Sequence, residues 1–148
     1  MSVTALYSPY VRWPSEPPRV FLTLSLIAPA AAEDRRAAIE SVIEGQIEAF
    51  SRNDGDAAFA FASPEIQRIF GNPGRFMETV RAGFAPVYRP RNYAFEPPIV
   101  ADGLPAQPVR LIGPDGRGFI ALYRMEEQPE GSWRIAEVTL HLIAERGI

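Results

Sequence analysis

The order of two periodicities constrains this 148-residue chain most strongly. Up to about residue 87, apolar residues recur at the three- and four-residue spacing of helices. From Tyr88 onward, aromatic and β-branched residues are enriched in runs separated by turn signals, as in strands. Helices followed by a strand meander predict an α+β domain whose N-terminal helices pack on one face of an antiparallel sheet.

Each predicted helix has a polar residue suited to N-capping at its start. Proline in the first turn and a glycine or polar cluster at the end support several of these boundaries. The predicted helices are 34–51 capped by Asp34, 57–62 capped by Asp56, 64–71 capped by Ser63, and 73–83 capped by Asn72 and ended by Gly83 and Pro86.

Four strands are predicted in the second half: Asn92–Val100, Gln107–Ile112, Gly118–Gln128 and Ser132–Ile143. Two registers compete for the last pair. A two-residue turn at Glu130-Gly131 places Arg124 opposite Glu137 and gives one face Phe119, Ala121, Tyr123 and Met125 against Ala136, Val138, Leu140 and Leu142. A three-residue turn starting at Pro129 slips the pairing by one and moves Trp133, Glu137 and His141 to the Tyr123 face. We favour the first register near the helices, and a β-bulge near Ala136-Glu137 would satisfy both.

The segment before the first predicted helix has the layout of a secretory signal. The apolar run Val20–Ala28 leads into Ala30–Ala32, and polarity changes at Glu33. The run is shorter than the roughly 20 residues of a membrane-spanning helix. We therefore expect export to the periplasm or medium, cleavage after Ala32, and one mature domain over 33–148 with no membrane span. Residues 1–19 hold four prolines and two arginines, which indicates an overextended start, with a disordered tail as the alternative.

Composition excludes several functional classes. The chain has no cysteine and one histidine, so neither a disulfide framework nor a zinc site is expected, and no motif indicates another metal or a cofactor. Arg12, Glu16 and Arg19 precede residue 33, so the remainder carries 17 acidic residues against 13 arginines. A mildly acidic domain with scattered arginines argues against nucleic-acid binding.

Several segments resemble a known group of proteins. These are Ile47–Phe50, Ala58–Gly71, Phe76 and the later Gly131–Ile135. They resemble an uncharacterised family of exported bacterial domains, a domain of unknown function within the nuclear transport factor 2-like, or cystatin-like, superfamily. The resemblance covers nearly all of 34–142 and implies a cone of curved antiparallel sheet around helices. It implies no catalytic residue, because the family has no established activity. The superfamily contains isomerases, dehydratases, binding proteins and dimerisation modules, so the fold does not select among these functions.

Gln46 is the first candidate site residue, because it falls in the middle of an apolar helical stripe. A buried amide must be hydrogen-bonded, since leaving it unpaired costs roughly 1–3 kcal/mol. Gln46 either points into a cavity of the cone or bonds to the backbone of a turn, and most buried polar side chains do the latter or bind water.

The other candidates come from the second half. Tyr88, Tyr123 and Trp133 are candidates for lining an apolar pocket, although such aromatics are more often ordinary core residues. His141 is the sole histidine and, with Glu137, a weak catalytic candidate. Strand residues four apart are separated by about 13 Å, so the two do not touch without a bulge.

The function expected from these observations is a non-enzymatic module that binds a small apolar ligand or a protein partner, with a sheet face as a candidate homodimer interface. The alternative is a cone-fold enzyme of the isomerase or dehydratase kind, which does acid–base chemistry on a small hydrophobic substrate. An enzyme requires an enclosed cavity with at least two convergent polar groups.

Overall fold

The computed structural model describes residues 16–144. The chain divides after Ala37 into two compact units. The described part of the first unit consists of residues 16–37 of the helix α2, Glu16–Ser51. The second unit starts at Ala38 with the remainder of α2 and contains all later elements.

The predicted start of the first helix at Asp34 is wrong. Helix α2 begins at Glu16 and runs through the apolar segment and the expected cleavage site without interruption. Ala30–Ala32 precede Glu33-Asp34, and Arg35-Arg36 and Ala37-Ala38 follow it. Alanine has the highest helix propensity and arginine is also a good helix former. The acidic pair therefore lies inside the helix, where Asp34 is exposed and caps nothing.

Four short helices follow: α3 Gly55–Ala60, α4 Pro64–Phe70, α5 Pro73–Gly83 and α6 Ala85–Tyr88. The predicted caps of α4 and α5 are confirmed, since Ser63 Oγ accepts from Ile66 N and Asn72 Oδ1 from Arg75 N. The cap of α3 is Asp54 and not Asp56, because Asp54 Oδ1 accepts from Ala57 N at 3.1 Å. Helix α6 was not predicted; the proline expected to end α5 instead occupies the first turn of α6.

The second half forms a five-stranded antiparallel sheet, which confirms the α+β class. Its strands are β1 Asn92–Phe95, β2 Ile99–Ala101, β3 Leu104–Ile112, β4 Gly118–Glu127 and β5 Trp133–Leu142. The order is β1-β3-β4-β5, and β2 also pairs with β3. The single strand predicted over Asn92–Val100 is wrong, because Pro97-Pro98 cannot donate to a ladder and divides it into β1 and β2.

A hairpin that the sequence analysis missed joins β2 to β3. Ala101 pairs with Leu104, which leaves Asp102-Gly103 as a two-residue turn. Both turn residues have positive φ, 50° and 78°, as a type I′ turn requires. Strand β3 therefore begins at Leu104, three residues before the predicted start.

The β4–β5 hairpin contains both competing registers, joined by a bulge at Ala136 as expected. Arg124 pairs with Glu137, as in the first register, whereas Met125 pairs with Ile135, as in the second. The first register continues from Arg124 to Phe119, and the second continues to the three-residue turn that begins at Pro129. The bulge corrects the predicted inner face, because Ile135 replaces Ala136 opposite Met125.

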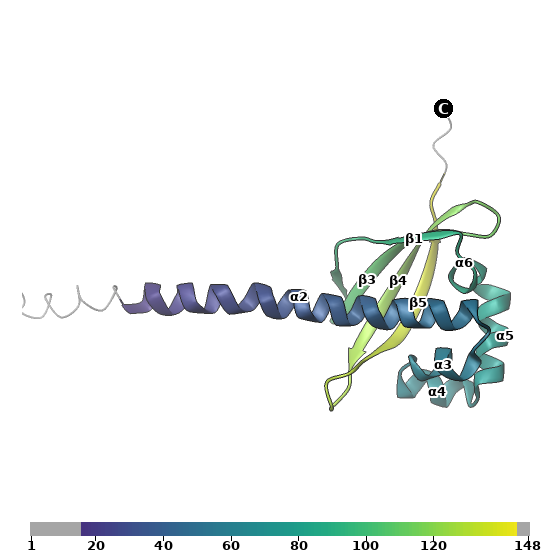
Figure 1. Ribbon diagram of the computed structural model, residues 1–148, viewed down its shortest axis with the longest axis horizontal. Helices are drawn as coiled ribbons and strands as arrows, with labels where there is room; N and C mark the ends of the chain where they lie inside the picture. Colours follow the sequence, from purple (N-terminus) through teal and green to yellow (C-terminus); the bar gives the residue numbers. More distant parts are fainter. Residues whose placement is uncertain (1–15, 145–148) are drawn as a thin grey trace, which may run out of the picture. The chain divides into compact units, whose positions relative to one another are not determined.

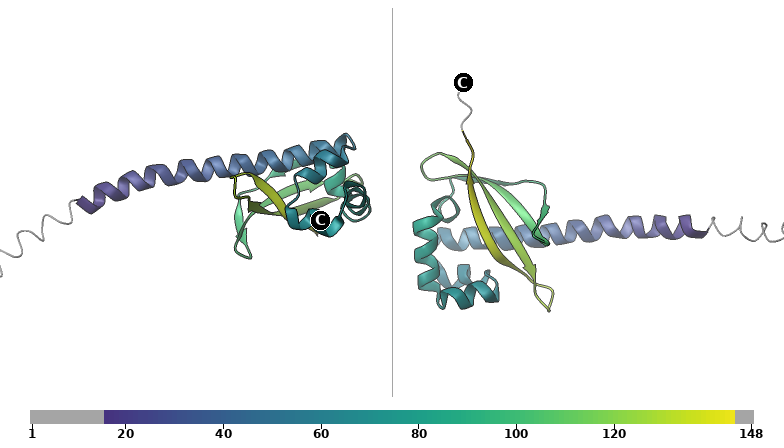
Figure 2. Two further views of the ribbon diagram at one scale, coloured as in Figure 1. Left: turned by 90° about the horizontal axis from the view of Figure 1, so that it is seen from below. Right: turned by 180° about the vertical axis from the view of Figure 1, so that it is seen from behind.

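One face of the sheet packs against the helices and forms the core (Figure 1). Helices α3 to α6 gather at one end of the sheet, and the strands run side by side (Figure 2). The core includes Ile43 and Phe50 of α2, Val109 and Leu111 of β3, Tyr123 and Met125 of β4, and Ile135 of β5. The opposite face carries polar and charged side chains such as Arg110 and His141.

Candidate functional site

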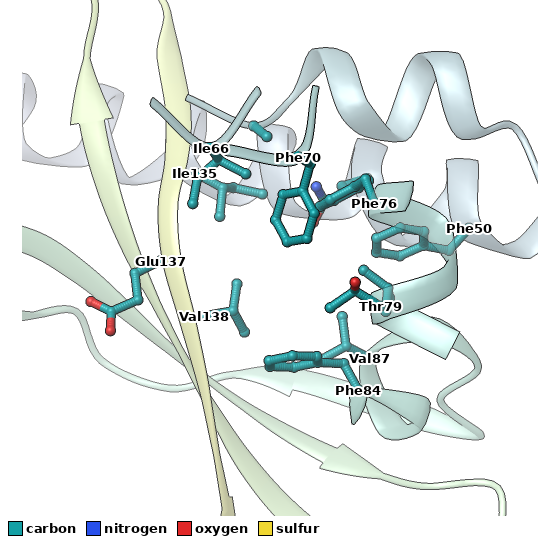
Figure 3. A pocket seen from close by; sticks show the side chains of 13 residues that line it. Phe50, Ile66, Phe70, Phe76, Thr79, Phe84, Val87, Ile135, Glu137 and Val138 are labelled. Atoms are coloured by element: carbon teal, nitrogen blue, oxygen red, sulfur yellow. The ribbon is translucent and has the colours of Figure 1, made fainter. Parts of the chain in front are cut away.

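An apolar pocket of about 190 Å³ lies between the helices and β5. Figure 3 shows phenylalanine rings around this hollow, with Val138 pointing into it from β5. Most of its lining is aromatic or aliphatic: Gln46, Phe50, Ala62, Ile66, Phe70, Phe76, Thr79, Val80, Phe84, Val87, Ile135, Glu137 and Val138. The lining includes buried, half-buried and exposed residues, so the pocket reaches the surface.

The capped helices place the aromatic wall of the pocket. Phe76 is buried near the start of α5, and its ring centroid lies 5.4–6.1 Å from those of Phe50, Phe59 and Phe70. Such tilted and edge-on pairs contribute about 0.5–1.5 kcal/mol each beyond their buried area. The rings therefore form one packed cluster in the core, and those of Phe50, Phe70 and Phe76 also line the pocket.

Gln46 is the polar side chain at the buried part of this pocket, with 3% of its surface exposed. Its Nε2 donates to the carbonyl of Ala58 in α3 at 3.1 Å. The side chain therefore bonds to the backbone of a helix and not of a turn, and it also lines the pocket.

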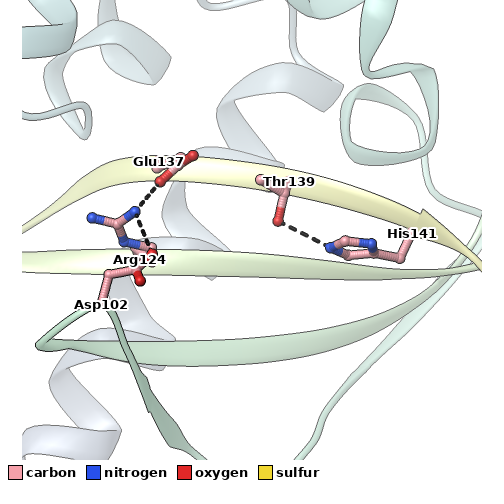
Figure 4. Close-up of polar contacts among 5 residues, drawn as sticks. All are labelled: Asp102, Arg124, Glu137, Thr139 and His141. Carbon is pink, nitrogen blue, oxygen red and sulfur yellow. Dashed lines mark hydrogen bonds and ion pairs between the residues drawn. The ribbon is translucent and has the colours of Figure 1, made fainter.

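Glu137 and His141 lie on the outer face of β5, where they do not form a catalytic pair. Glu137 forms an ion pair with Arg124, which also lies 3.4 Å from Asp102. His141 is exposed, and its Nε2 lies 3.3 Å from Thr139 Oγ1 (Figure 4). The bulge at Ala136 precedes both residues and does not shorten the distance between them.

Tyr123 and Trp133 are on the inner face but do not line the pocket, although Tyr123 pairs with Val138, which does. Tyr123 is completely buried, and its hydroxyl has no hydrogen-bond partner among the described residues. Burial is the main cause that raises the pKa of this hydroxyl, and the charge of the neighbouring Tyr93 is a second cause. Trp133 is half-buried against the core at the end of the second register. Both behave as core residues.

Tyr88 belongs to a surface cluster at the end of α6. Its hydroxyl accepts from Arg81 Nε at 3.2 Å and donates to Asn53 Oδ1. The guanidinium of Arg89 lies over its ring, 4.8 Å from the centroid. Hydrogen bonding from Arg81 is the main cause that lowers the pKa of Tyr88. A shallow depression of about 310 Å³ beside it is lined by arginine and polar residues as well as by Tyr93 and Ile47.

Comparison with known proteins assigns a family. Residues 32–146 match the domain described as "Domain of unknown function (DUF4864)". The chain belongs to the DUF4864 family. No curated protein and no solved structure matches it.

The DUF4864 pocket contains residues that the sequence analysis did not select. Phe84 and Thr79 face the cavity from the end of α5, and Val138 closes it from β5. Phe84 continues the four-residue spacing of Phe76 and Val80, but it follows Gly83, where the helix was predicted to end, and so it was not selected. Val138 was predicted on the inner face, but nothing local indicated that helices would leave a gap above it.

Two structural features are absent from residues 16–144 of this DUF4864 chain. Within them, no cluster of three or more histidine, aspartate or glutamate side chains is arranged to hold a metal ion. No helix in that range combines the length and apolar character needed to cross a membrane.

Proposed function

We propose that this protein binds a small, neutral, apolar molecule in the pocket between α4, α5, α6 and β5. The main observation that supports this proposal is the aromatic-lined pocket, which remains open although Phe76 packs against Phe50 and Phe70. Its volume of about 190 Å³ is close to the roughly 150 Å³ of an apolar cavity known to bind benzene. The lining holds no arginine or histidine to balance an anion.

Binding accounts for this pocket better than catalysis does. Acid–base chemistry needs a titratable group within hydrogen-bond reach of the reacting atom. The carboxylate of Glu137 is paired with Arg124, and in Figure 3 the side chain points away from the rings. His141 is not among the residues that line the pocket. The isomerase-like or dehydratase-like alternative therefore lacks a pair of convergent groups in this hollow.

Toluene is the probe that tests this proposal. A ligand that binds only the folded state raises the thermal midpoint of unfolding in a concentration-dependent way. We expect this with the wild-type chain, and we expect the effect to vanish in Val138→Trp, whose indole fills the pocket. Thr139→Trp is the matched control, because the next residue on β5 points to the outer face. Absence of a shift in the wild type, or an equal shift in Val138→Trp, contradicts the proposal.

We also propose that the protein is exported and loses its leader after Ala32. The small residues at Ala30 and Ala32 favour cleavage at that bond. The matched family domain begins at residue 32, and the second compact unit begins at Ala38, so removal of the leader spares both almost entirely. After cleavage, Glu33 and Asp34 would lie at a helix N-terminus, where the dipole favours acidic residues.

Amino-terminal sequencing of protein recovered from the periplasm and medium of a bacterial host tests export. The expected first residue is Glu33, and Ala32→Arg should block processing because the site requires small residues. An unprocessed, wholly intracellular wild-type chain would contradict this proposal.

We further propose that the fold is a member of the nuclear transport factor 2-like superfamily. The helices precede the sheet and cover one of its faces, and the bulge at Ala136 adds bend to β5, as a cone requires. Superposition of an experimental structure of residues 33–148 on superfamily members is the test. A flat sheet would argue against membership.

A further inference from the structure

The amide of Gln46 has a determined orientation. Ala58 O can only accept a hydrogen bond, so the side-chain atom 3.1 Å from it must be Nε2, and Oε1 is turned away. No donor to Oε1 is found among the described residues, yet Oε1 is not one of the fully enclosed unpaired atoms. Because Gln46 lines the pocket and is 97% buried, the cavity is the space that its oxygen can face.

We propose that the pocket recognises a neutral, single-ring molecule that carries one hydroxyl group, and that this hydroxyl donates a hydrogen bond to Gln46 Oε1. This inference rests on the proposed function and specifies its ligand. The rings of Phe70, Phe76 and Phe84 would contact the carbon skeleton. The hydroxyl would lie at the buried end of the site, where Gln46 is the polar side chain.

The lining also defines what the site rejects. Burying a carboxylate or an amine without a partner is strongly unfavourable, and the pocket offers neither a cation nor a free carboxylate near Gln46. A ligand hydroxyl that found no acceptor would lose its hydrogen bonds to water without replacement. Thr79 also lines the pocket but is exposed, so Gln46 is the buried side chain that should favour a phenolic ring over a hydrocarbon ring of the same shape.

The experiment compares phenol with toluene, which differ by a hydroxyl in place of a methyl group. Dissociation constants are measured by calorimetry with the full chain as wild type, Gln46→Met and Gln67→Met. Gln67 is the matched control, because its Nε2 also donates to backbone carbonyls, those of Phe59 and Ala62, but it does not line the pocket. In Gln46→Met, Ala58 O still accepts from Phe61 N, so the fold should persist.

We expect Gln46→Met to weaken phenol relative to toluene by about tenfold, the usual cost of an unpaired buried donor, with no such change in Gln67→Met. Equal effects of the two substitutions overturn the inference. If toluene binds and the ratio is unchanged in Gln46→Met, this inference fails while the proposed function stands. If neither molecule binds the wild type, the proposed function itself fails.

A measurement on the wild-type chain removes dependence on the variant. The side-chain amide resonances of Gln46 should shift when phenol is added and remain nearly constant with toluene, whereas methyl resonances of Val138 should shift with both. Equal responses of the Gln46 amide to the two molecules overturn the inference.

Discussion

At the scale of single residues, ionisation of Tyr123 should lower the stability of the folded protein at alkaline pH. Its pKa is raised in the folded state by burial, whereas an unfolded tyrosine ionises near pH 10. The folded state therefore binds this proton more tightly, and the stability it contributes is present below about pH 10 and is lost as pH rises further. Tyr123→Phe should remove this loss. At pH 7 it should leave stability unchanged or raise it by up to about 1 kcal/mol, because the hydroxyl has no partner among the described residues.

Urea unfolding at pH 7 and about pH 11 measures this effect. Tyr88→Phe is a control of opposite sign, because Arg81 lowers the pKa of Tyr88 and its ionised form is favoured by folding. A Tyr123→Phe chain as sensitive to alkali as the wild type would contradict the assignment.

Gly45 is a second residue whose role is local and steric. A Cβ atom at this position would lie 2.7 Å from Phe61 Cζ, closer than real contacts allow. Alanine gains about 1 kcal/mol of helix propensity over glycine, but the clash with a packed ring should cost more. We expect Gly45→Ala to destabilise the protein by about 1 kcal/mol in urea unfolding.

The matched double substitution identifies the cause. In a Phe61→Leu background, Gly45→Ala should be neutral or stabilising, since the ring is gone and the propensity gain remains. The same loss in both backgrounds would show that Phe61 is not the reason for the glycine.

At the scale of helices and strands, the boundaries that were predicted correctly depend on residues that are close together in the sequence. The starts of α4 and α5 were correct because cap, proline and first turn lie within a few residues of one another. The hairpin at Asp102-Gly103 also has a local signal, because an Asp-Gly pair is typical of a two-residue turn, but the sequence analysis did not use it. The sequence left two registers open for β4 and β5, because charge pairing favoured one and the turn at Pro129 favoured the other. The structure contains both registers, which are joined by a bulge.

Ser63 links one of these elements to the sheet. Its Oγ caps α4 at 3.3 Å, and its backbone N donates to Ile135 O at 2.9 Å, so the cap lies in a fully buried junction. Ser63→Ala should cost about 1–2 kcal/mol in urea unfolding, toward the upper part of the range for caps. Ser132→Ala removes an exposed serine hydroxyl in a turn and should cost less than about 0.5 kcal/mol. Similar losses for the two would contradict a special role for Ser63.

At the scale of the whole molecule, the pocket was beyond sequence reasoning for a physical reason. Gln46 was found because helical periodicity placed a polar residue on an apolar stripe. Whether a void exists beside it depends on how closely α5 and α6 approach β5, and that distance is set by packing of the whole core. The same limit applies to Tyr123, whose place on the inner face was predicted but whose exclusion from the pocket lining was not.

The boundary of the folding unit gives the last prediction. Ile39 and Ile43 are buried in the core, whereas residues 30–38 are exposed, so the buried part of α2 in the second unit begins at Ile39. A chain of residues 33–148 should therefore unfold at the same urea concentration as residues 1–148. A chain that starts at Gly45 loses both isoleucines, each worth roughly 1.5–3 kcal/mol of burial, from a total stability that is typically about 5–15 kcal/mol. It should be largely unfolded by circular dichroism. Equal midpoints for the two shorter chains would place the core outside α2, and a destabilised 33–148 chain would mean that the preceding residues belong to the fold.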